Sequence, residues 1–258
     1  MLALSSSHDG APLTLAEREE ARAQVAALNT RFRHFGTSYF LEAVLTRGVF
    51  DRIAMVSSFG AESAVLLHLI AQIDRALPVL FIDTRMLFPE TLAYQLELAE
   101  HLGLSNVQTI RADDMALATQ DPYGALHLRD PDTCCDLRKT RVLNAALQNF
   151  DAWITGRKRH QSTTRSGLHY FDLDEGTGRI KINPLIDWKP ARIAAHFDTH
   201  ALPRHPLVAQ GYPSIGCKPC TSRAGANEDP RAGRWRGNDK TECGLHGLTP
   251  PIQQGTRP

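Results

Sequence analysis

The sequence has no stretch of eighteen apolar residues, so a membrane-spanning helix is not expected. Residues 1–14 lack the basic region and the apolar run of a signal peptide. Long runs of lysine or arginine are also missing, and the net charge is +1, which argues against a general affinity for nucleic acid or anionic membranes. These absences predict a cytoplasmic protein that binds neither nucleic acid nor membrane.

Cysteine is scarce, and its count of five is odd. In a reducing compartment, such a set favours thiolate chemistry or metal binding over a disulfide framework. The 258 residues are 42% hydrophobic and 22% charged, so the chain is able to bury a full core. Basic residues gather only locally: seven Lys or Arg lie between Arg204 and Lys240, where they are suited to hold a small polyanion.

Short buried strands are expected to alternate with helices over most of the chain. The predicted strands are residues 53–56, 78–82, 106–110, 152–155 and 180–185. The predicted helices are residues 14–32, opened by Thr14 as N-cap, and 38–47, 64–73, 85–102, 133–147 and 191–200. This alternation is typical of parallel β-α-β units, so the expected fold is α/β with a parallel sheet and helices on both faces.

A loop of small residues follows the first predicted strand. It reads Ser-Ser-Phe-Gly-Ala-Glu-Ser from Ser57 to Ser63 and leads into an apolar helix. Free backbone N–H groups and the helix dipole converge at such a junction, which makes it a phosphate site. An ordinary strand–helix turn is the alternative, because the loop has a single glycine. Asp83 ends the second predicted strand, where open α/β sheets place their ligands.

Four cysteines form two pairs that are distant in the sequence, Cys134-Cys135 and Cys217-Lys-Pro-Cys220. Four thiolates suit a tetrahedral zinc ion or a four-iron cluster. Structural zinc usually takes two spaced pairs, whereas adjacent cysteines reach different metal ions of a cluster more easily. A cluster, a zinc ion and unligated thiols all remain open on these residues alone.

The first cysteine pair is expected to lie in the first turn of the helix that Thr133 caps. The helix dipole favours thiolates in that turn. Lys139 follows Cys135 by four residues and so shares its face of the helix, where its ammonium group can offset the negative charge of a cluster. An ordinary surface lysine is the alternative.

The two cysteine pairs, followed by Glu242-Cys243-Gly244-Leu245-His246, resemble the assimilatory adenylyl-sulfate reductases over about residues 55–246. The loop resembles the pyrophosphate loop Ser-x-Gly-x-x-Ser of the ATP pyrophosphatases, with Glu62 where those enzymes usually have aspartate. The resemblance implies an adenine-nucleotide alpha-hydrolase-like fold. Its expected parts are a disordered N-terminus (residues 1–13), a nucleotide-binding α/β domain (14–202) and a flexible, cluster-completing and catalytic C-terminal segment (203–258).

The resemblance also implies an activity, namely the thioredoxin-dependent reduction of adenosine 5'-phosphosulfate to sulfite and AMP in sulfate assimilation. In this family the cysteine that corresponds to Cys243 attacks the sulfur and forms an S-sulfocysteine; a spare thiol is the alternative. The implied cofactor is one 4Fe-4S cluster on Cys134, Cys135, Cys217 and Cys220, modulated by Lys139. Thioredoxin or a glutaredoxin-like protein is the expected reductant, and a homo-oligomer remains an option.

The expected substrate-binding residues come from both parts of the chain. They are Ser57, Ser58, Phe59, Gly60, Ser63, Asp83, Arg165, Arg231, Arg234 and His246. Forked arginine side chains suit the sulfate and phosphate oxygens. At three positions the sequence departs from common relatives: Arg85 replaces a glycine, Lys158 an arginine and His160 an aspartate.

Three rival hypotheses remain. Reduction of 3'-phosphoadenylyl sulfate is the nearest, since enzymes with that activity share the loop and the Glu-Cys-Gly-Leu-His motif but usually lack the two cysteine pairs. A tRNA thiolation enzyme with a pyrophosphate loop needs a broad basic face, which the charge does not suggest. A non-catalytic zinc-binding module is the third.

Overall fold

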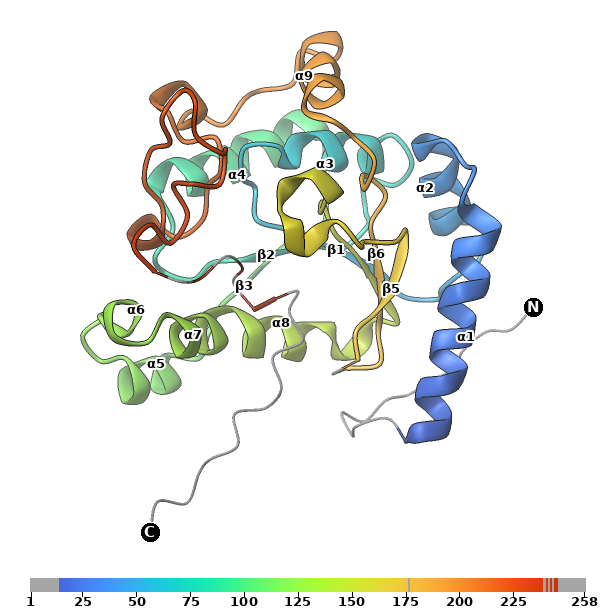
Figure 1. Ribbon diagram of the computed structural model, residues 1–258, viewed down its shortest axis with the longest axis horizontal. Helices are drawn as coiled ribbons and strands as arrows, with labels where there is room; N and C mark the ends of the chain where they lie inside the picture. The colour runs from blue at the N-terminus through green and yellow to red at the C-terminus, as the bar shows by residue number, and fades with distance from the viewer. Residues whose placement is uncertain (1–13, 176, 239, 241, 243, 246–258) are drawn as a thin grey trace.

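The computed structural model describes residues 14–175, 177–238, 240, 242, 244 and 245 (Figure 1). Its strands are β1 (Ile53–Ser57), β2 (Val79–Ile82), β3 (Val107–Ile110), β4 (Ala152–Ile154), β5 (Phe171–Leu173) and β6 (Ile180–Ile182). They form one six-stranded sheet in the order β3-β2-β1-β4-β6-β5. The predicted parallel sheet is confirmed for the five strands from β3 to β6.

Strand β5 is antiparallel to β6 and was not predicted. It has only three residues and is too short to show an alternating pattern. The predicted strand over residues 180–185 ends at Ile182, two residues before Pro184. Proline cannot donate a hydrogen bond to the sheet, so it marks the end of the pairing.

Helices cover both faces of the sheet, as predicted (Figure 1). Met55, Phe81 and Ile154 face a large core that is shared with α2 (Thr37–Thr46), α3 (Ser63–Ala71), α4 (Pro89–Leu102) and α9 (Pro190–Thr199). The residues beside them in the strands, such as Ala54, Leu80 and Trp153, face the opposite way and pack against α8 (Arg141–Ala146). Both faces are therefore apolar, which is typical of parallel sheets.

Helix α1 (Leu15–Phe32) lies along the β5 edge of the sheet. Asn29 exchanges two hydrogen bonds with the backbone of Phe171, at 2.8 and 3.0 Å. The predicted N-cap is confirmed, because the Thr14 hydroxyl accepts a bond from the backbone N–H of Glu17 and the Glu17 carboxylate accepts one from Thr14.

The predicted cap at Thr133 is wrong. The N-cap is Asp130, whose carboxylate accepts the backbone N–H of Thr133 at 3.0 Å, and α7 (Pro131–Cys135) begins at a proline. Proline is favoured in the first turn of a helix, because its missing N–H would have no partner there anyway. A π-helical turn (Asp136–Thr140) separates α7 from α8, so the expected single helix over residues 133–147 is interrupted.

Two short helices, α5 (Asp114–Gln120) and α6 (Leu126–Arg129), precede α7. Leu117 of α5 and Leu126 of α6 pack with Cys134 and Leu137 in a small separate core. Among the helices that the structure describes, none combines the length and the apolar character of a transmembrane span.

Candidate active site

A cavity of about 550 Å³ opens at the carboxyl ends of β1 and β4. These strands are neighbours, but the chain runs from β1 toward β2 and β3 before it returns to β4 on the other side. Open α/β sheets bind their ligands at such a reversal of strand order. The volume lies within the range of about 300–1,000 Å³ that is typical of small-molecule sites.

The loop after β1 forms one wall of the cavity. The hydroxyl of Ser63 accepts the backbone N–H of Gly60 at 2.9 Å, and the hydroxyl of Ser57 accepts that of Phe59 at 3.2 Å. A Cβ atom on Gly60 would lie 3.3 Å from the hydroxyl oxygen of Ser58. The loop is therefore closely folded on itself in front of the N-terminus of α3.

Phe59 adopts a left-handed backbone conformation, with φ of 45°. Its ring is fully buried and packs edge-on against Phe81, with ring centroids 5.2 Å apart. The side chain thus anchors the loop in the core and does not line the cavity. Only the backbone of Phe59 is available to a ligand.

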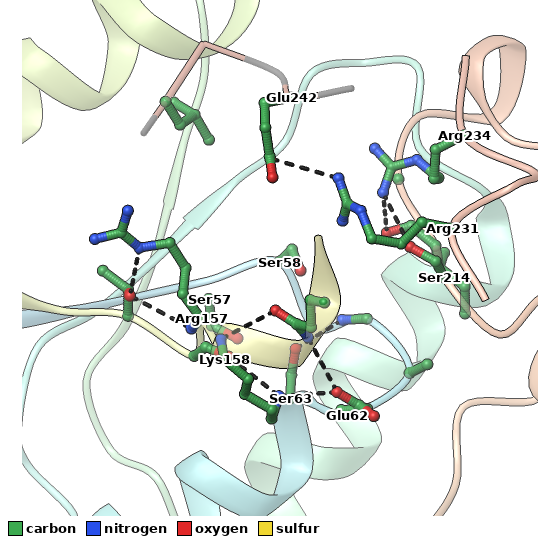
Figure 2. A pocket seen from close by; sticks show the side chains of 18 of the residues that line it. Ser57, Ser58, Glu62, Ser63, Arg157, Lys158, Ser214, Arg231, Arg234 and Glu242 are labelled. Carbon is green, nitrogen blue, oxygen red and sulfur yellow. Dashed lines mark hydrogen bonds and ion pairs between the residues drawn. The ribbon is translucent and has the colours of Figure 1, made fainter. Parts of the chain in front are cut away.

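A buried ion pair joins this loop to the loop after β4. The ammonium of Lys158 lies 2.8 Å from the Glu62 carboxylate and also donates to the carbonyl of Gly156 at 3.1 Å (Figure 2). The Lys158 side chain is 3% exposed, and that of Glu62 is 33% exposed. Burial lowers the pKa of Lys158, and the charge of Glu62 partly offsets this effect.

Arg157 is held from behind by polar residues of the sheet. Its guanidinium donates to the side-chain oxygen of Asn183 at 3.1 Å and to the carboxylate of Asp172 at 3.4 Å. Burial lowers the pKa of Arg157 to about 10, so it remains a cation at neutral pH. It adds a fixed positive charge to the wall of the cavity.

Two of the predicted arginines share one carboxylate. Arg165 donates two hydrogen bonds to Glu242, at 2.7 and 2.8 Å. Arg231 approaches the same carboxylate at 3.4 Å (Figure 2). Burial raises the pKa of Glu242, but the hydrogen bonds and charge of Arg165, with that of Arg231, lower it overall. Arg165 follows β4 in the chain, so this contact ties the C-terminal segment to the sheet.

Glu242 and Leu245 line the cavity. Cys243 and His246, the predicted nucleophile and a predicted substrate-binding residue, lie outside the described residues.

The third predicted arginine, Arg234, lies beside the loop that carries Cys217. Its guanidinium donates to the carbonyl of Ile215 at 3.3 Å and lies over the Trp235 ring, 4.5 Å from the centroid. A Cβ atom on Gly216 would lie 2.3 Å from this guanidinium. Only glycine permits so close an approach.

The two cysteine pairs meet at the side of the cavity. Cys134, Cys135 and Cys217 are buried, Cys220 is half-buried, and none of these four is in a disulfide bond. Burial raises the pKa of Cys134 to about 11, and the charges of Cys135, Cys217 and Cys220 contribute in the same direction. The four sulfur atoms therefore share one neighbourhood.

Thr84 links the two cysteine segments. Its hydroxyl lies 3.2 Å from the sulfur of Cys217, and its carbonyl accepts a hydrogen bond from Arg138 at 2.9 Å. Arg138 follows the first cysteine pair and forms a buried ion pair with Asp121 at 2.7 Å. Thr84, which follows β2, therefore contacts both cysteine segments.

Lys139 lines the cavity and interacts with Cys217. Burial raises the pKa of Cys217, but the charge of Lys139 and hydrogen bonds from Thr84 and Lys139 lower it overall. An ammonium group therefore lies next to a cysteine of the second pair. The sequence had associated Lys139 with the first pair through helical spacing.

Asp83 does not line the cavity. Its carboxylate accepts the Nε–H of Arg111 at 2.9 Å and the backbone N–H of Arg85 at 2.8 Å. Arg85 has a φ of 58°, so it adopts the left-handed conformation that a glycine would take most easily. Asp83 shapes this turn in the present structure.

The structure brings most of the predicted site residues together. The predicted residues that line the cavity are Ser57, Ser58, Gly60, Ser63, Lys139, Arg165, Cys217, Arg231 and Arg234. The Lys158–Glu62 pair and the Arg165–Glu242 pair were missed. The sequence carried a signal for the first, because Glu62 and Lys158 have opposite charges and both lie in loops that follow predicted strands.

Comparison with known proteins agrees with this geometry. Residues 52–223 match the phosphoadenosine phosphosulfate reductase domain. An adenosine 5'-phosphosulfate reductase of Mesorhizobium japonicum is 48% identical over 225 residues, 87% of each chain. One of Chelativorans sp. is 44% identical and covers 88% of this chain and 92% of its own.

A solved phosphoadenylyl-sulfate reductase of Candida auris shares the fold, with a TM-score of 0.66 and 22% identity, over 82% of this chain and all of its own. The cavity therefore lies in a chain with the same fold as that solved reductase. From the domain match and the two close relatives, the chain belongs to the phosphoadenosine phosphosulfate reductase family.

Proposed function

We propose that this protein reduces adenosine 5'-phosphosulfate to sulfite and AMP in sulfate assimilation, with electrons from a thioredoxin-type dithiol. The names of its two similar relatives support this substrate. The observation that carries the proposal is a single cavity where a phosphate loop, arginines and a cysteine of the second pair meet. The reaction does not hydrolyse ATP, so the site needs no group that activates a water molecule.

The cavity provides cations where the substrate has oxyanions. Arg231 and Arg234 come from the C-terminal segment, and Arg165 comes from the loop after β4. The loop from Ser57 to Ser63 offers backbone N–H groups at the start of α3 to the 5'-phosphate. Forked arginine hydrogen bonds then hold the sulfate. These contacts bind and orient the substrate, and the chemical step is left to the nucleophile.

Cys243 is the nucleophile of this proposal. Its thiolate attacks the sulfur, the bond between sulfur and the phosphate oxygen breaks, and AMP leaves with that electron pair. The product on the enzyme is an S-sulfocysteine. A reductant thiolate then attacks the sulfur of Cys243, sulfite leaves, and the second thiol of the reductant resolves the mixed disulfide. Cys243 is regenerated, and the dithiol is oxidised to a disulfide.

Cys134, Cys135, Cys217 and Cys220 are the residues that would hold a four-iron cluster. Their shared neighbourhood and the raised pKa of Cys134 fit this role, because buried thiolates need a cation nearby. A cluster on these residues would supply a fixed charge and would join α7 to the segment around Cys217. Lys139 contributes an ammonium group on the cavity side of Cys217.

The two parts of the chain divide the work in this proposal. Residues 14–202 bind the nucleotide, and residues 203–258 complete the cluster and supply the catalytic thiol. Reduction of the 3'-phosphorylated nucleotide is the second candidate, since the matching domain is named for it. Comparison of kcat/KM for the two nucleotides separates them, and a preference for the 3'-phosphorylated one overturns our assignment.

The decisive experiment separates binding from chemistry. Without reductant, the wild-type protein should release about one AMP per active site and gain about 80 Da, the mass of a sulfo group, on the peptide with Cys243. Cys243→Ser should bind the nucleotide, retain its iron and release no AMP. Cys217→Ser should lose iron and activity together. AMP release that requires reductant, or added mass on another cysteine, contradicts the mechanism.

A further inference from the structure

Three histidines gather between α3 and α9, outside the cavity. Nδ1 of His68 lies 3.1 Å from Nε2 of His196. The ring centroid of His200 is 4.5 Å from that of His68 and 4.3 Å from that of His196. One ring nitrogen from each residue lies within 4.8 Å of the other two. None of the three lines the cavity.

Helix geometry creates this cluster. His196 and His200 are four residues apart at the end of α9, so they project from one face of the helix. His68 projects from α3, which packs against α9. Because His68 and His196 are 128 residues apart in the sequence, only the packing of the two helices brings the rings together.

The spacing matches metal coordination. Zinc–nitrogen bonds of about 2.0–2.1 Å in a tetrahedron place two ligand nitrogens about 3.3 Å apart. The separation between His68 and His196 is close to this value. His200 is exposed, so its ring is free to adjust by a rotamer change, and the open side leaves room for a water ligand.

The surroundings leave the three rings without a carboxylate partner among the described residues. In that part of the chain no ion pair joins any of the three rings to a carboxylate. The neutral ring is the form that binds metal. The amide nitrogen of Gln72 lies 3.4 Å from Nε2 of His68, and the Trp188 ring packs edge-on against His196.

We propose that His68, His196 and His200 form a binding site for a divalent transition metal ion, with Zn²⁺ as the preferred occupant. Three neutral nitrogen ligands suit zinc, copper and nickel better than calcium or magnesium, which take oxygen ligands. A flip of the Gln72 amide would turn its oxygen toward His68, where it would accept the Nε2–H and fix the ring, as hydrogen bonds do for other metal-bound histidines. The ion would join α9 to α3, the helix that begins at the phosphate loop.

Zinc titration of anaerobically purified protein, with its own cofactor in place, tests the proposal. The variants are His196→Asn and His200→Asn, and the control is His34→Asn, an exposed histidine between α1 and α2. Wild type and control should bind one more Zn²⁺ than either variant. At a free Zn²⁺ concentration about a hundredfold above Kd, the melting temperature of the wild type and of the control should rise by about 5 °C or more. The melting temperature of the two variants should not rise.

Cobalt distinguishes this site from the cysteines. Co²⁺ on three imidazoles should give d–d absorption without a sulfur-to-metal charge-transfer band, and His200→Asn should abolish it. His200 is exposed, so this variant should keep the wild-type far-ultraviolet circular dichroism. Equal zinc stoichiometry and affinity in wild type and His200→Asn, or a thiolate charge-transfer band with Co²⁺, would overturn the proposal.

Discussion

The ammonium of Lys158 and the carboxylate of Glu62 lie 2.8 Å apart and link the loop after β4 to the phosphate loop after β1. Glu62 stands where aspartate is usual and Lys158 where arginine is usual, so each residue keeps the charge expected at its position and the two form an ion pair. The pair is a tie between the two strands at which the sheet reverses its order.

Removal of one partner of this pair should cost more than removal of both. Lys158→Met leaves the Glu62 carboxylate without its counter-charge, and Glu62→Gln leaves a buried ammonium without its own. We expect a coupling energy of about 1–3 kcal/mol between the two substitutions, measured by urea unfolding of the single and double variants. Strict additivity would show that the pair does not stabilise the loop.

The buried Asp121–Arg138 pair should dominate the stability of the cysteine-bearing helix. Asp121→Asn should reduce the free energy of unfolding by about 3–5 kcal/mol, because Arg138 remains buried without a counter-charge. Asp136→Asn is a matched control, since Asp136 pairs with Arg141 in the same region but both side chains are exposed. That change should cost no more than about 1 kcal/mol.

The same pair gives a signed pH dependence. Burial raises the pKa of Asp121, but the hydrogen bond from Arg138 and those from backbone N–H groups lower it overall. The contribution is therefore complete above the ordinary carboxyl pKa and is lost as pH falls through the lowered value. Unfolding midpoints from pH 7 to pH 3 should fall less steeply in Asp121→Asn than in the wild type. Parallel curves would assign the acid sensitivity to other groups.

Glu242 should act on the chemical step rather than on overall stability. Glu242→Gln weakens the contact of the C-terminal segment with Arg165 and Arg231, so single-turnover AMP release should slow about tenfold, equivalent to about 1.4 kcal/mol. Glu228→Gln serves as control, because Glu228 pairs with the exposed Arg236 of the same segment. Equal rates in Glu242→Gln and wild type would remove Glu242 from the mechanism.

Gly216 should control the position of Arg234. A methyl group at residue 216 would overlap the guanidinium, so Gly216→Ala should displace this flexible side chain and raise KM for the nucleotide about tenfold. Gly36→Ala has no neighbour within 4 Å of the new atom and should leave KM unchanged. An unchanged KM in Gly216→Ala would show that Arg234 does not contact the substrate.

Local sequence was sufficient to predict most of the architecture. Apolar strands such as Val79–Ile82 alternate with helices, and both faces of a parallel sheet are buried, so pattern and fold agree. The Thr14 cap was also predictable, because the capping box lies within four residues of sequence. The Asp130 cap was not predicted, although Pro131 at the first helical position is a local signal for it.

Tertiary packing decided how the site is connected. The two cysteine pairs and the arginines were visible as residues, but their distances depend on which strands pair. Sequence order cannot reveal that Glu62 meets Lys158 across 96 residues, that Glu242 meets Arg165 across 77, or that His68 meets His196 across 128. Periodicity encodes which face of an element is buried, whereas contacts between distant side chains are fixed only when those faces pack together.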